Sequence, residues 1–400
     1  NPNPSTNEIN QMMRGQLCRC TGYQPIVDAI KAAARGEPDK QAKAPTIGHS
    51  CSRSDADDKV RGTCKYSPDL WDADTLHAVV VRSEKPHAKL GGVDPNRALA
   101  IDGVLRVLTH EDVTGKLCYG NAIPDMPSLC REKVRFVGDA IAIVIATDPL
   151  LARLGAEQVE VFYEDLPAVT DAERALDEDA PRVHKHGNLA SEQYLRKGNA
   201  TEALAAADVV ITRRYQTPFQ EHACLEVESA LAFIQDDQLI IKSPSQNVYF
   251  DRREVARVTG WPKKNVVIQQ QPMGAAFGKR EDLYCQHHAA LATIAMNGRA
   301  VRVAMSREDT FLATTKRHPF FMEYTIGANR EGRILGLQAS LIADTGAYAS
   351  WAPNILRKAL VHGAGAFQIF CRRPRCCNKY LAESLTASKA YARIRQGRLY

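Results

Sequence analysis

The sequence predicts an α+β protein made of a short helical unit, an α/β unit and a longer strand-rich unit. Three observations support this: two short amphipathic stretches at the start, strand-like runs flanking a helical run in the middle, and alternating apolar and polar runs later. The expected segments are a helical unit 1–35, a linker 36–57, an α/β unit 58–170, a connection 171–197, a strand-rich unit 198–370 and an aberrant basic tail 371–400.

Two short helices are expected in the first unit, with a loop between them that carries two cysteines. Ser5 and Glu8 fit a capping box before the first helix, and Pro25 lies in the first turn of the second. Cys18 and Cys20 lie between the helices, and thiolates at this spacing can bind a soft metal or a cluster. From the pair alone, two buried structural thiols remain an alternative.

The α/β unit is indicated by a strand, helix, strand order. Residues 76–81 and 136–145 are rich in β-branched and apolar residues. A helix is expected from Asp148 to about Glu160, followed by a strand over 161–163. This order is typical of an α/β layer.

The strand-rich unit is expected to contain hairpins and helices. Asp236 and Asp237 lie at a hairpin turn between apolar runs, and Gly260 ends the first helix. The expected strands cover 206–216, 229–241, 266–268, 299–305, 320–327 and 333–344, and the expected helices 251–259, 281–296 and 356–365.

A turn of small residues with one aromatic, 273–278, follows the strand at 266–268. Gly274, Ala275, Ala276 and Gly278 let backbone amides approach a ligand closely, so the turn can hold an anion or an oxo group. It lacks the Gly-Lys-Ser/Thr of a P-loop and the full spacing of a dinucleotide fingerprint. A plain tight turn before a helix is the alternative from local sequence.

The formal net charge of +6 arises at one end of the chain. Residues 371–400 hold eight Lys and Arg against one Glu, so the rest is close to neutral and gives no electrostatic basis for nucleic-acid binding. There is no apolar run long enough to cross a membrane and no signal-peptide pattern. The odd total of 11 cysteines favours reduced thiols or metal ligands. We therefore expect a cytoplasmic protein without nucleic-acid or membrane partners.

Five motifs occur in a characteristic order along the chain. They are Cys18-Arg19-Cys20-Thr21-Gly22-Tyr23, Phe219-Gln220-Glu221-His222, Ser245-Gln246-Asn247, Met273-Gly274-Ala275-Ala276-Phe277-Gly278 and Arg317-His318-Pro319-Phe320. Together they resemble the molybdenum hydroxylases, the family of xanthine dehydrogenase and aldehyde oxidoreductase. The run from Gln246 to Glu254 is most similar to the bacterial purine-hydroxylase branch. The resemblance covers about residues 5–368.

The resemblance implies a molybdopterin-type molybdenum cofactor and a [2Fe–2S] cluster. Cys18 and Cys20 would be two of the four cluster ligands. Gln246 would contact the apical molybdenum oxygen, although local sequence alone favours a surface amide. Gly274, Phe277 and Gly278 would form the loop whose amides face the molybdenum site.

Two further positions bear on the substrate and on the loop. Glu281 matches by spacing a carboxylate that orients the heterocycle in purine-oxidising members, and a first-turn helix acid is its alternative. Lys279 stands where the family has a second glycine. Arg317 and His318 are expected to be structural.

The implied fold is a helical remnant of a [2Fe–2S] domain, an α/β hammerhead-like domain over 58–170 and the first part of a molybdopterin-binding domain over 198–370. Both metal centres are expected to be incomplete in a chain truncated at both ends. FAD would lie on a partner, so flavin-binding and iron–sulfur subunits or domains are expected, with a homo-oligomer possible.

The implied activity is hydroxylation of a purine, another N-heterocycle or an aldehyde. The oxygen would derive from water, and electrons would pass through [2Fe–2S] to the flavin partner. The alternative is a non-catalytic remnant chain without a bound metal centre.

Overall fold

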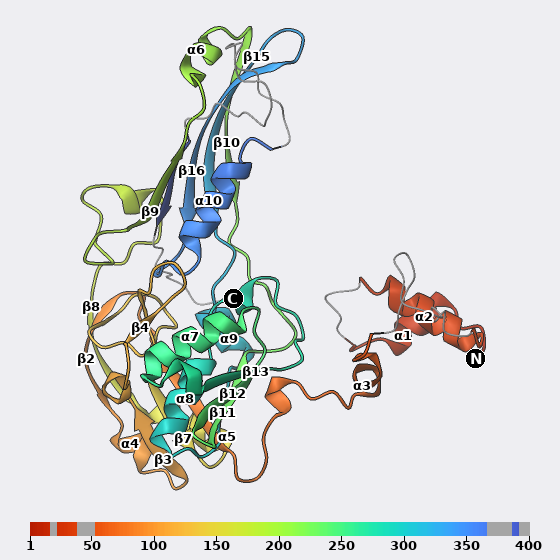
Figure 1. Ribbon diagram of the computed structural model, residues 1–400, viewed down its shortest axis with the longest axis vertical. Coiled ribbons are helices and arrows are strands. Elements are labelled where there is room, and N and C mark those ends of the chain that lie inside the picture. Colours follow the sequence, from red (N-terminus) through yellow and green to blue (C-terminus); the bar gives the residue numbers. More distant parts are fainter. Residues whose placement is uncertain (17–21, 38–52, 366–385, 392–400) are drawn as a thin grey trace.

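The computed structural model describes residues 1–16, 22–37, 53–365 and 386–391. Within them helices and strands are mixed, as the predicted α+β class requires, and two large sheets dominate (Figure 1). The α+β prediction is confirmed.

The larger sheet has seven strands and joins two parts of the chain that the sequence separates. Strand β1 pairs in parallel with β14, through Leu76 opposite Val301, and antiparallel with β7. The strand order is β13 (Val266–Gln270), β12 (Gln238–Ser243), β11 (Ser229–Gln235), β14 (Val301–Ala304), β1 (Leu76–Arg82), β7 (Ala140–Ala146) and β3 (Val104–Leu108). The α/β unit and the first part of the strand-rich unit therefore share one sheet.

Both faces of this sheet are covered, so its central strands are apolar on both sides. Val80 and Ile143 pack into a core with helices α7 (Val248–Thr259) and α8 (Gln286–Ala295). On the opposite face, Val81 and Val144 pack with α5 (Pro149–Gln158), next to α4 (Asn96–Leu99). Burial on both faces explains the continuous apolar run of β7.

The second sheet has five strands and extends away from the first (Figure 1). Its order is β10 (Val209–Thr217), β15 (Phe320–Ala328), β16 (Ile334–Asp344), β17 (Thr386–Tyr391) and β9 (Leu189–Leu195). Helix α10 (Ala352–His362) packs on β9 and β17, and α6 (Ala200–Ala205) packs on β16.

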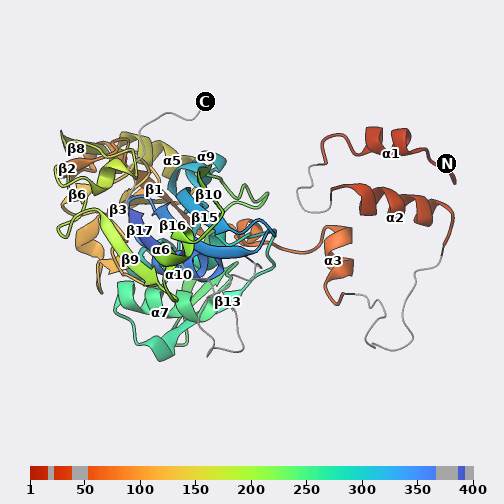
Figure 2. The same cartoon turned by 90° about the horizontal axis from the view of Figure 1, so that it is seen from above.

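Shorter elements complete the fold. Helices α1 (Thr6–Met12) and α2 (Gln24–Ala34) lie side by side, tied by a 2.6 Å hydrogen bond from Lys31 Nζ to Thr6 Oγ1, and Figure 2 shows them with α3 (Ala56–Arg61) beside the sheets. The others are α9 (Arg307–Ala313), β2 (Ala88–Asp94), β4 (Cys118–Tyr119), β5 (Met126–Pro127), β6 (Lys133–Val134), β8 (Glu160–Asp165), and 3₁₀ turns at Ser67–Asp69, His110–Asp112, Arg174–Leu176, Lys263–Asn265 and Lys279–Glu281.

Residues that predict helix ends and turns from the local sequence adopt those structures in the fold. Ser5 and Glu8 make the reciprocal capping box, Asp148 caps α5, and Gly260 ends α7 in the left-handed conformation with φ +72°. The turn between β11 and β12 has φ of +49° at Asp236 and +57° at Asp237, a conformation that aspartate tolerates.

Three expectations differ from the structure. The helix expected over 281–296 begins only at Gln286, because the Gln286 side chain accepts hydrogen bonds from the backbone N–H groups of Tyr284 and Cys285. The connection 171–197 contains β9 in its second half, paired through the sheet. The basic tail contributes β17, which pairs with β16 and β9, so residues 386–391 belong to the second sheet.

Across the described ranges, no helix combines the length and the apolar character needed to span a membrane.

Candidate functional site

Among the described residues, the main cavity has a volume of about 1270 Å³ and lies between the five-stranded sheet, helix α10 and the 277–282 segment. Small-molecule sites commonly measure about 300–1,000 Å³, so this space has room for more than one small ligand. Its walls come from the end of β10 and the residues after it, the 277–282 segment, strands β15 and β16, and helix α10.

The small-residue turn forms one wall of this cavity and has an unusual backbone. Ala275, Phe277 and Gly278 have φ of +110°, +54° and +98°. The Phe277 side chain is 58% exposed although it is aromatic. A Cβ built on Gly278 would meet only His222 Nε2, at 4.0 Å, so a ligand can approach this backbone closely.

Gly274 serves the turn differently, because it faces the protein interior. Its N–H donates a 2.7 Å hydrogen bond to Glu226 Oε2, and a Cβ in its place would lie 2.9 Å from the Cβ of Glu226. Glycine is therefore required here for close packing. Its amide is used inside the protein.

Gln246 joins the turn from the loop after β12. Its Oε1 accepts a 3.1 Å hydrogen bond from the Gly278 N–H, and its own backbone N–H donates to the Arg280 carbonyl at 3.0 Å. The first bond orients the side-chain amide, because only the oxygen can accept. Within the described residues, Gln246 Nε2 has no hydrogen-bond partner, so it can donate to an external acceptor.

A buried ion-pair network supports the turn, and two of its members, Glu221 and Lys316, also line the cavity. Lys279 Nζ lies 3.0 Å from Glu228 Oε1 and 3.7 Å from Glu221 Oε1. The Lys279 side chain is fully buried, so the residue in place of a second glycine points away from the cavity. Further pairs join Arg280 to Glu226 and Glu228, and Lys316 Nζ to Glu221 Oε2 at 2.7 Å. Three cations thus balance three carboxylates.

Glu281 and Asp282 line the same cavity just after the turn. Glu281 is partly exposed, and its backbone carbonyl accepts a 3.2 Å hydrogen bond from Trp351 Nε1. Burial raises the pKa of Asp282 to about 6, while the 2.6 Å hydrogen bond from Ser350 Oγ acts in the opposite direction. Glu281 lies in a 3₁₀ turn, five residues before α8, and so is not an acid in that helix's first turn.

The structure brings most of the sequence-predicted site residues together. Phe277, Gly278 and Glu281 line the cavity, and Gln246 contacts Gly278 at its edge. Gly274 anchors the turn from inside. Cys18 and Cys20 lie outside the described residues.

The glutamates that pair with the 279–280 segment carry no clear signal in the sequence. Glu221 stands out only as part of a motif, and nothing in the local pattern singles out Glu226 or Glu228. Their partners Lys279 and Arg280 lie about 50 residues further along the chain. A local signal exists only in the density of charge, three glutamates within eight residues, and that pattern is usually a solvated surface.

One available donor and an open backbone at the turn fit an oxygen-rich cofactor of the molybdopterin type, since the N–H groups of Gly274 and Gly278 already donate to Glu226 and Gln246. The oriented Gln246 amide offers a free Nε2–H, and the exposed backbone at 277–278 has positive φ and an open approach.

Comparison with protein families identifies three matched regions. Residues 1–31 match the [2Fe-2S] binding domain, residues 61–167 the aldehyde oxidase and xanthine dehydrogenase a/b hammerhead domain, and residues 183–377 the molybdopterin cofactor-binding domain.

Individual relatives agree with these matches. The chain is 35% identical over 324 residues to the nicotinate dehydrogenase large molybdopterin subunit of Eubacterium barkeri, covering 81% of this chain and 76% of that protein. It is 36% identical to a probable xanthine dehydrogenase subunit of Bacillus subtilis, covering 79% of this chain but only 43% of that protein. The solved aldehyde oxidoreductase of Desulfovibrio gigas has a TM-score of 0.89 and 29% identity, covering 98% of this chain and 45% of its own. The chain thus spans less than half the length of the last two proteins.

Proposed function

The chain belongs to the molybdenum hydroxylases, the family of aldehyde oxidases and xanthine dehydrogenases, and on this premise we propose that it acts in the hydroxylation of an N-heterocycle. A purine or a pyridine such as nicotinate is favoured, and an aldehyde is the second candidate. Relatives named for xanthine, nicotinate and aldehydes support this range. The added oxygen would derive from water.

The observation that carries the proposal is the shared wall of the cavity. Phe277, Gly278 and Glu281 line one space of about 1270 Å³, and Gln246 is fixed at its edge by the Gly278 N–H. A molybdenum cofactor bound there would supply the redox chemistry and the oxygen transfer. Gln246 Nε2 would donate to its oxygen, and the backbone of Phe277 and Gly278 would allow its close approach.

Glu281 would orient the heterocycle beside that group. Its side chain belongs to a partly exposed residue on the cavity wall, where it can accept a hydrogen bond from a ring N–H. An aldehyde offers no such donor. Removal of the Glu281 charge should therefore affect heterocycles more than aldehydes.

The electron path is proposed from the matched domains. Cys18 and Cys20 would be two ligands of a [2Fe–2S] cluster in the region that matches the iron–sulfur family. Electrons would leave through such clusters to FAD on a partner subunit or domain. The segments 1–35, 58–170 and 198–370 would be the iron–sulfur, hammerhead and molybdopterin units, and self-association is compatible with this arrangement.

The test is metal analysis combined with a dye-reduction assay on the chain purified with its native partners. We expect molybdenum to co-purify and xanthine, hypoxanthine or nicotinate to reduce the dye. Gln246→Ala should lower both molybdenum content and turnover. Glu281→Gln should lower kcat/KM for the heterocycle by about 10- to 100-fold, as expected for loss of a charged hydrogen bond, and change aldehyde turnover little.

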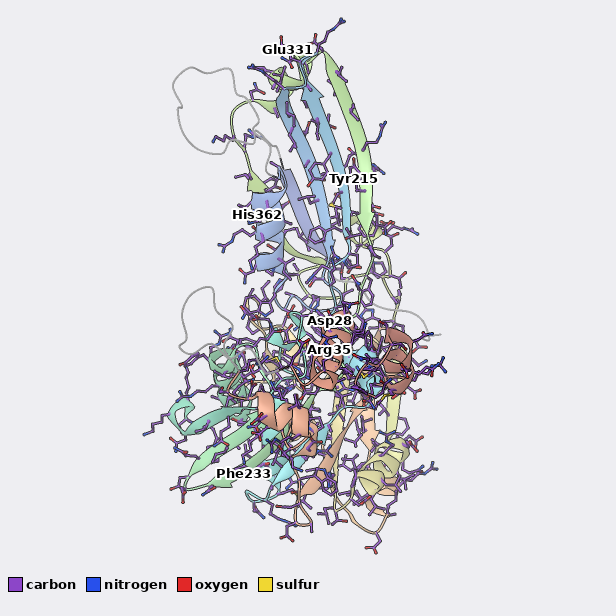
Figure 3. The ribbon with its side chains drawn as sticks, turned by 90° about the vertical axis from the view of Figure 1, so that its right-hand side faces the viewer. Asp28, Arg35, Tyr215, Phe233, Glu331 and His362 are labelled. Carbon is purple, nitrogen blue, oxygen red and sulfur yellow. The ribbon has the colours of Figure 1, made fainter. Side chains whose placement is uncertain are left out.

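Matched controls are available at exposed positions far from the cavity. Gln238→Ala lies at the β11–β12 hairpin, and Glu331→Gln lies at the tip of the second sheet, labelled in Figure 3. Both should behave as the unmodified chain. A metal-free preparation that reduces no dye with any substrate would reject the proposal and favour a non-catalytic chain.

A further inference from the structure

The loop between β16 and α10, residues 345–351, forms a second wall of the main cavity. Thr345, Ser350 and Trp351 line the cavity from this loop. The loop carries no regular structure over most of its length, and Ser350 has φ of +44°, an uncommon conformation for a non-glycine residue. Its shape must therefore be maintained by contacts with other parts of the chain.

Three successive residues of this loop are each held by a different aspartate. The Tyr348 hydroxyl donates to Asp139 at 2.9 and 3.0 Å from its two carboxylate oxygens. The Ala349 N–H donates to Asp125 at 3.0 Å, and the Ser350 hydroxyl donates to Asp282 at 2.6 Å. Carboxylates thus anchor the loop at three consecutive positions.

The three aspartates come from separate places in the fold. Asp139 directly precedes β7 and Asp125 directly precedes β5, both in the hammerhead-like region. Asp282 follows the 279–281 turn, next to Glu281. Asp139 and Asp282 are almost fully buried, at 1% and 7% exposed. The loop thus connects the hammerhead-like region to the cavity wall that carries Glu281.

Trp351, the last residue of the loop, contacts Glu281 directly. Trp351 Nε1 donates to the Glu281 carbonyl at 3.2 Å. This bond lies next to the bond from Ser350 to Asp282. Two hydrogen bonds therefore join residues 350–351 to residues 281–282 in register. Any displacement of the loop would displace the backbone of Glu281.

We propose that Asp125, Asp139 and Asp282 are positioning residues that fix the 345–351 loop and, through Ser350 and Trp351, set the position of Glu281 in the cavity. The inference rests on the role proposed for Glu281 and adds the hammerhead-like region to the determinants of substrate orientation. Asp125 and Asp139 do not line the main cavity, so their effect is indirect.

Hydrogen bonds, more than ion pairs, hold this arrangement. Arg135 lies beside it, with its backbone N–H donating to Asp139 Oδ2 at 2.7 Å and its guanidinium 5.8 Å from the centre of the Tyr348 ring. The contacts of the three carboxylates with the loop are hydrogen bonds from Tyr348, Ala349 and Ser350. Removal of one donor should therefore loosen the loop measurably.

The test is Tyr348→Phe in the full chain, because it removes one hydroxyl and touches neither Glu281 nor Asp282. Hydrogen–deuterium exchange should accelerate by about tenfold in the peptide covering residues 345–351 and also in the peptide covering 278–284, as expected for one lost hydrogen bond to a charged group. In a Trp71→Phe, Trp261→Phe background, the emission of Trp351 should shift to longer wavelength. No metal or substrate is needed, so the result is independent of the proposed activity.

Two controls separate positioning from general loosening. Tyr215→Phe alters an exposed tyrosine on β10, labelled in Figure 3, and should change neither peptide. Asp251→Asn alters another buried aspartate, which bonds to Gln286 and not to the loop, and should leave residues 345–351 unchanged. Asp125→Asn should reproduce the Tyr348→Phe pattern more weakly, since the amide oxygen still accepts.

Two results would overturn the inference. The first is faster exchange at 345–351 with no change at 278–284 in Tyr348→Phe. The second is an equal rise in exchange within β7 for both Tyr348→Phe and Asp125→Asn, because this would show loss of global stability instead of local coupling.

Discussion

At the scale of single residues, the buried charges behind the 273–278 turn are the least expected feature. A lysine in place of a small residue beside a cofactor loop suggests obstruction of the site. The structure instead directs its side chain inward to Glu228 and Glu221, and its cost of burial is offset by these carboxylates. The turn can thus keep an open outer surface.

Replacement of Lys279 by methionine should destabilise the protein. The change leaves Glu228 and Glu221 buried with less compensation, and breaking a buried pair from one side costs about 3–5 kcal/mol. Urea unfolding followed by circular dichroism measures the loss. Lys264→Met, at an exposed position after α7, is the control and should stay within about 0.5 kcal/mol. A loss below about 1 kcal/mol for Lys279→Met would show that the ion pairs of Lys279 contribute little to stability.

Asp251 should make stability depend on pH. Burial in α7 raises its pKa from 3.8 to about 7, despite hydrogen bonds from Ser245 and Gln286 that lower it. The folded state therefore binds this proton more tightly than the unfolded state. The stabilising contribution is full below about pH 4 and is lost as pH rises through about 7.

Asp251→Asn should accordingly stabilise the protein at pH 8, by up to about 4 kcal/mol, with the difference vanishing near pH 4. Thermal unfolding at a series of pH values measures this. Asp102→Asn, at an exposed position, is the control substitution and should change stability by no more than about 0.5 kcal/mol. A constant difference between Asp251→Asn and the unmodified chain from about pH 4 to about pH 8 would contradict the assignment.

At the scale of elements, the end of α7 is completed by a distant loop. The N–H groups of Gly115 and Lys116 donate to the carbonyls of Val258 and Arg257 at 2.9 and 2.7 Å, and Thr114 Oγ1 donates to the Thr259 carbonyl at 2.6 Å. These are the last carbonyls of the helix, which have no partners within it. The hammerhead-like region thus caps a helix of the strand-rich unit.

Gly115→Ala should break this contact. A Cβ at Gly115 would lie 2.3 Å from the Arg257 carbonyl oxygen, which is backbone and cannot move aside cheaply. We expect a loss of about 1–3 kcal/mol in thermal or urea unfolding. Gly91→Ala is the matched control, because its Cβ would lie at an ordinary 3.5 Å from Phe162. Equal effects of the two substitutions would show that the 114–116 loop does not press on α7.

At the scale of the whole molecule, the seven-stranded sheet joins the hammerhead-like region and residues 229–304 in one core. β1 lies between β14 and β7, so the hammerhead-like region supplies central strands of a sheet that the later region completes. Separate expression of residues 61–167 should expose the β1 edge and the apolar face beneath α7 and α8.

In a chain starting at residue 61, calorimetry should show the hammerhead-like region and residues 229–304 unfolding in one transition. The isolated 61–167 segment should unfold without cooperativity or aggregate, because much of its core comes from residues after 228. The control is the same chain with α1 and α2 retained, which should have an unchanged midpoint for this transition. Separate transitions for the hammerhead-like region and for residues 229–304 would contradict a shared core.

The sequence by itself determined the local structures and the family. Ser5 with Glu8, Asp148, the Asp236–Asp237 turn and Gly260 act through bonds and backbone angles within a few residues, so their signals are local. The ordered motifs indicated the family, and they placed Gln246, Phe277 and Gly278 where the structure brings two segments together. Strands β9 and β17 were not predicted from the sequence, because their pairing, rather than their composition, defines them.

Only the tertiary structure decided how distant segments support the site. Three kinds of contact join residues far apart in the chain. They are the pairing of β1 with β14, the ion pairs from Glu221, Glu226 and Glu228 to the 279–280 segment, and the hydrogen bonds from the 345–351 loop to Asp125, Asp139 and Asp282. Such contacts leave no periodicity or spacing in the sequence. These contacts form only where the side chains are buried, because a buried charge is costly unless it has a partner. Which side chains are buried is decided only when the whole chain has folded.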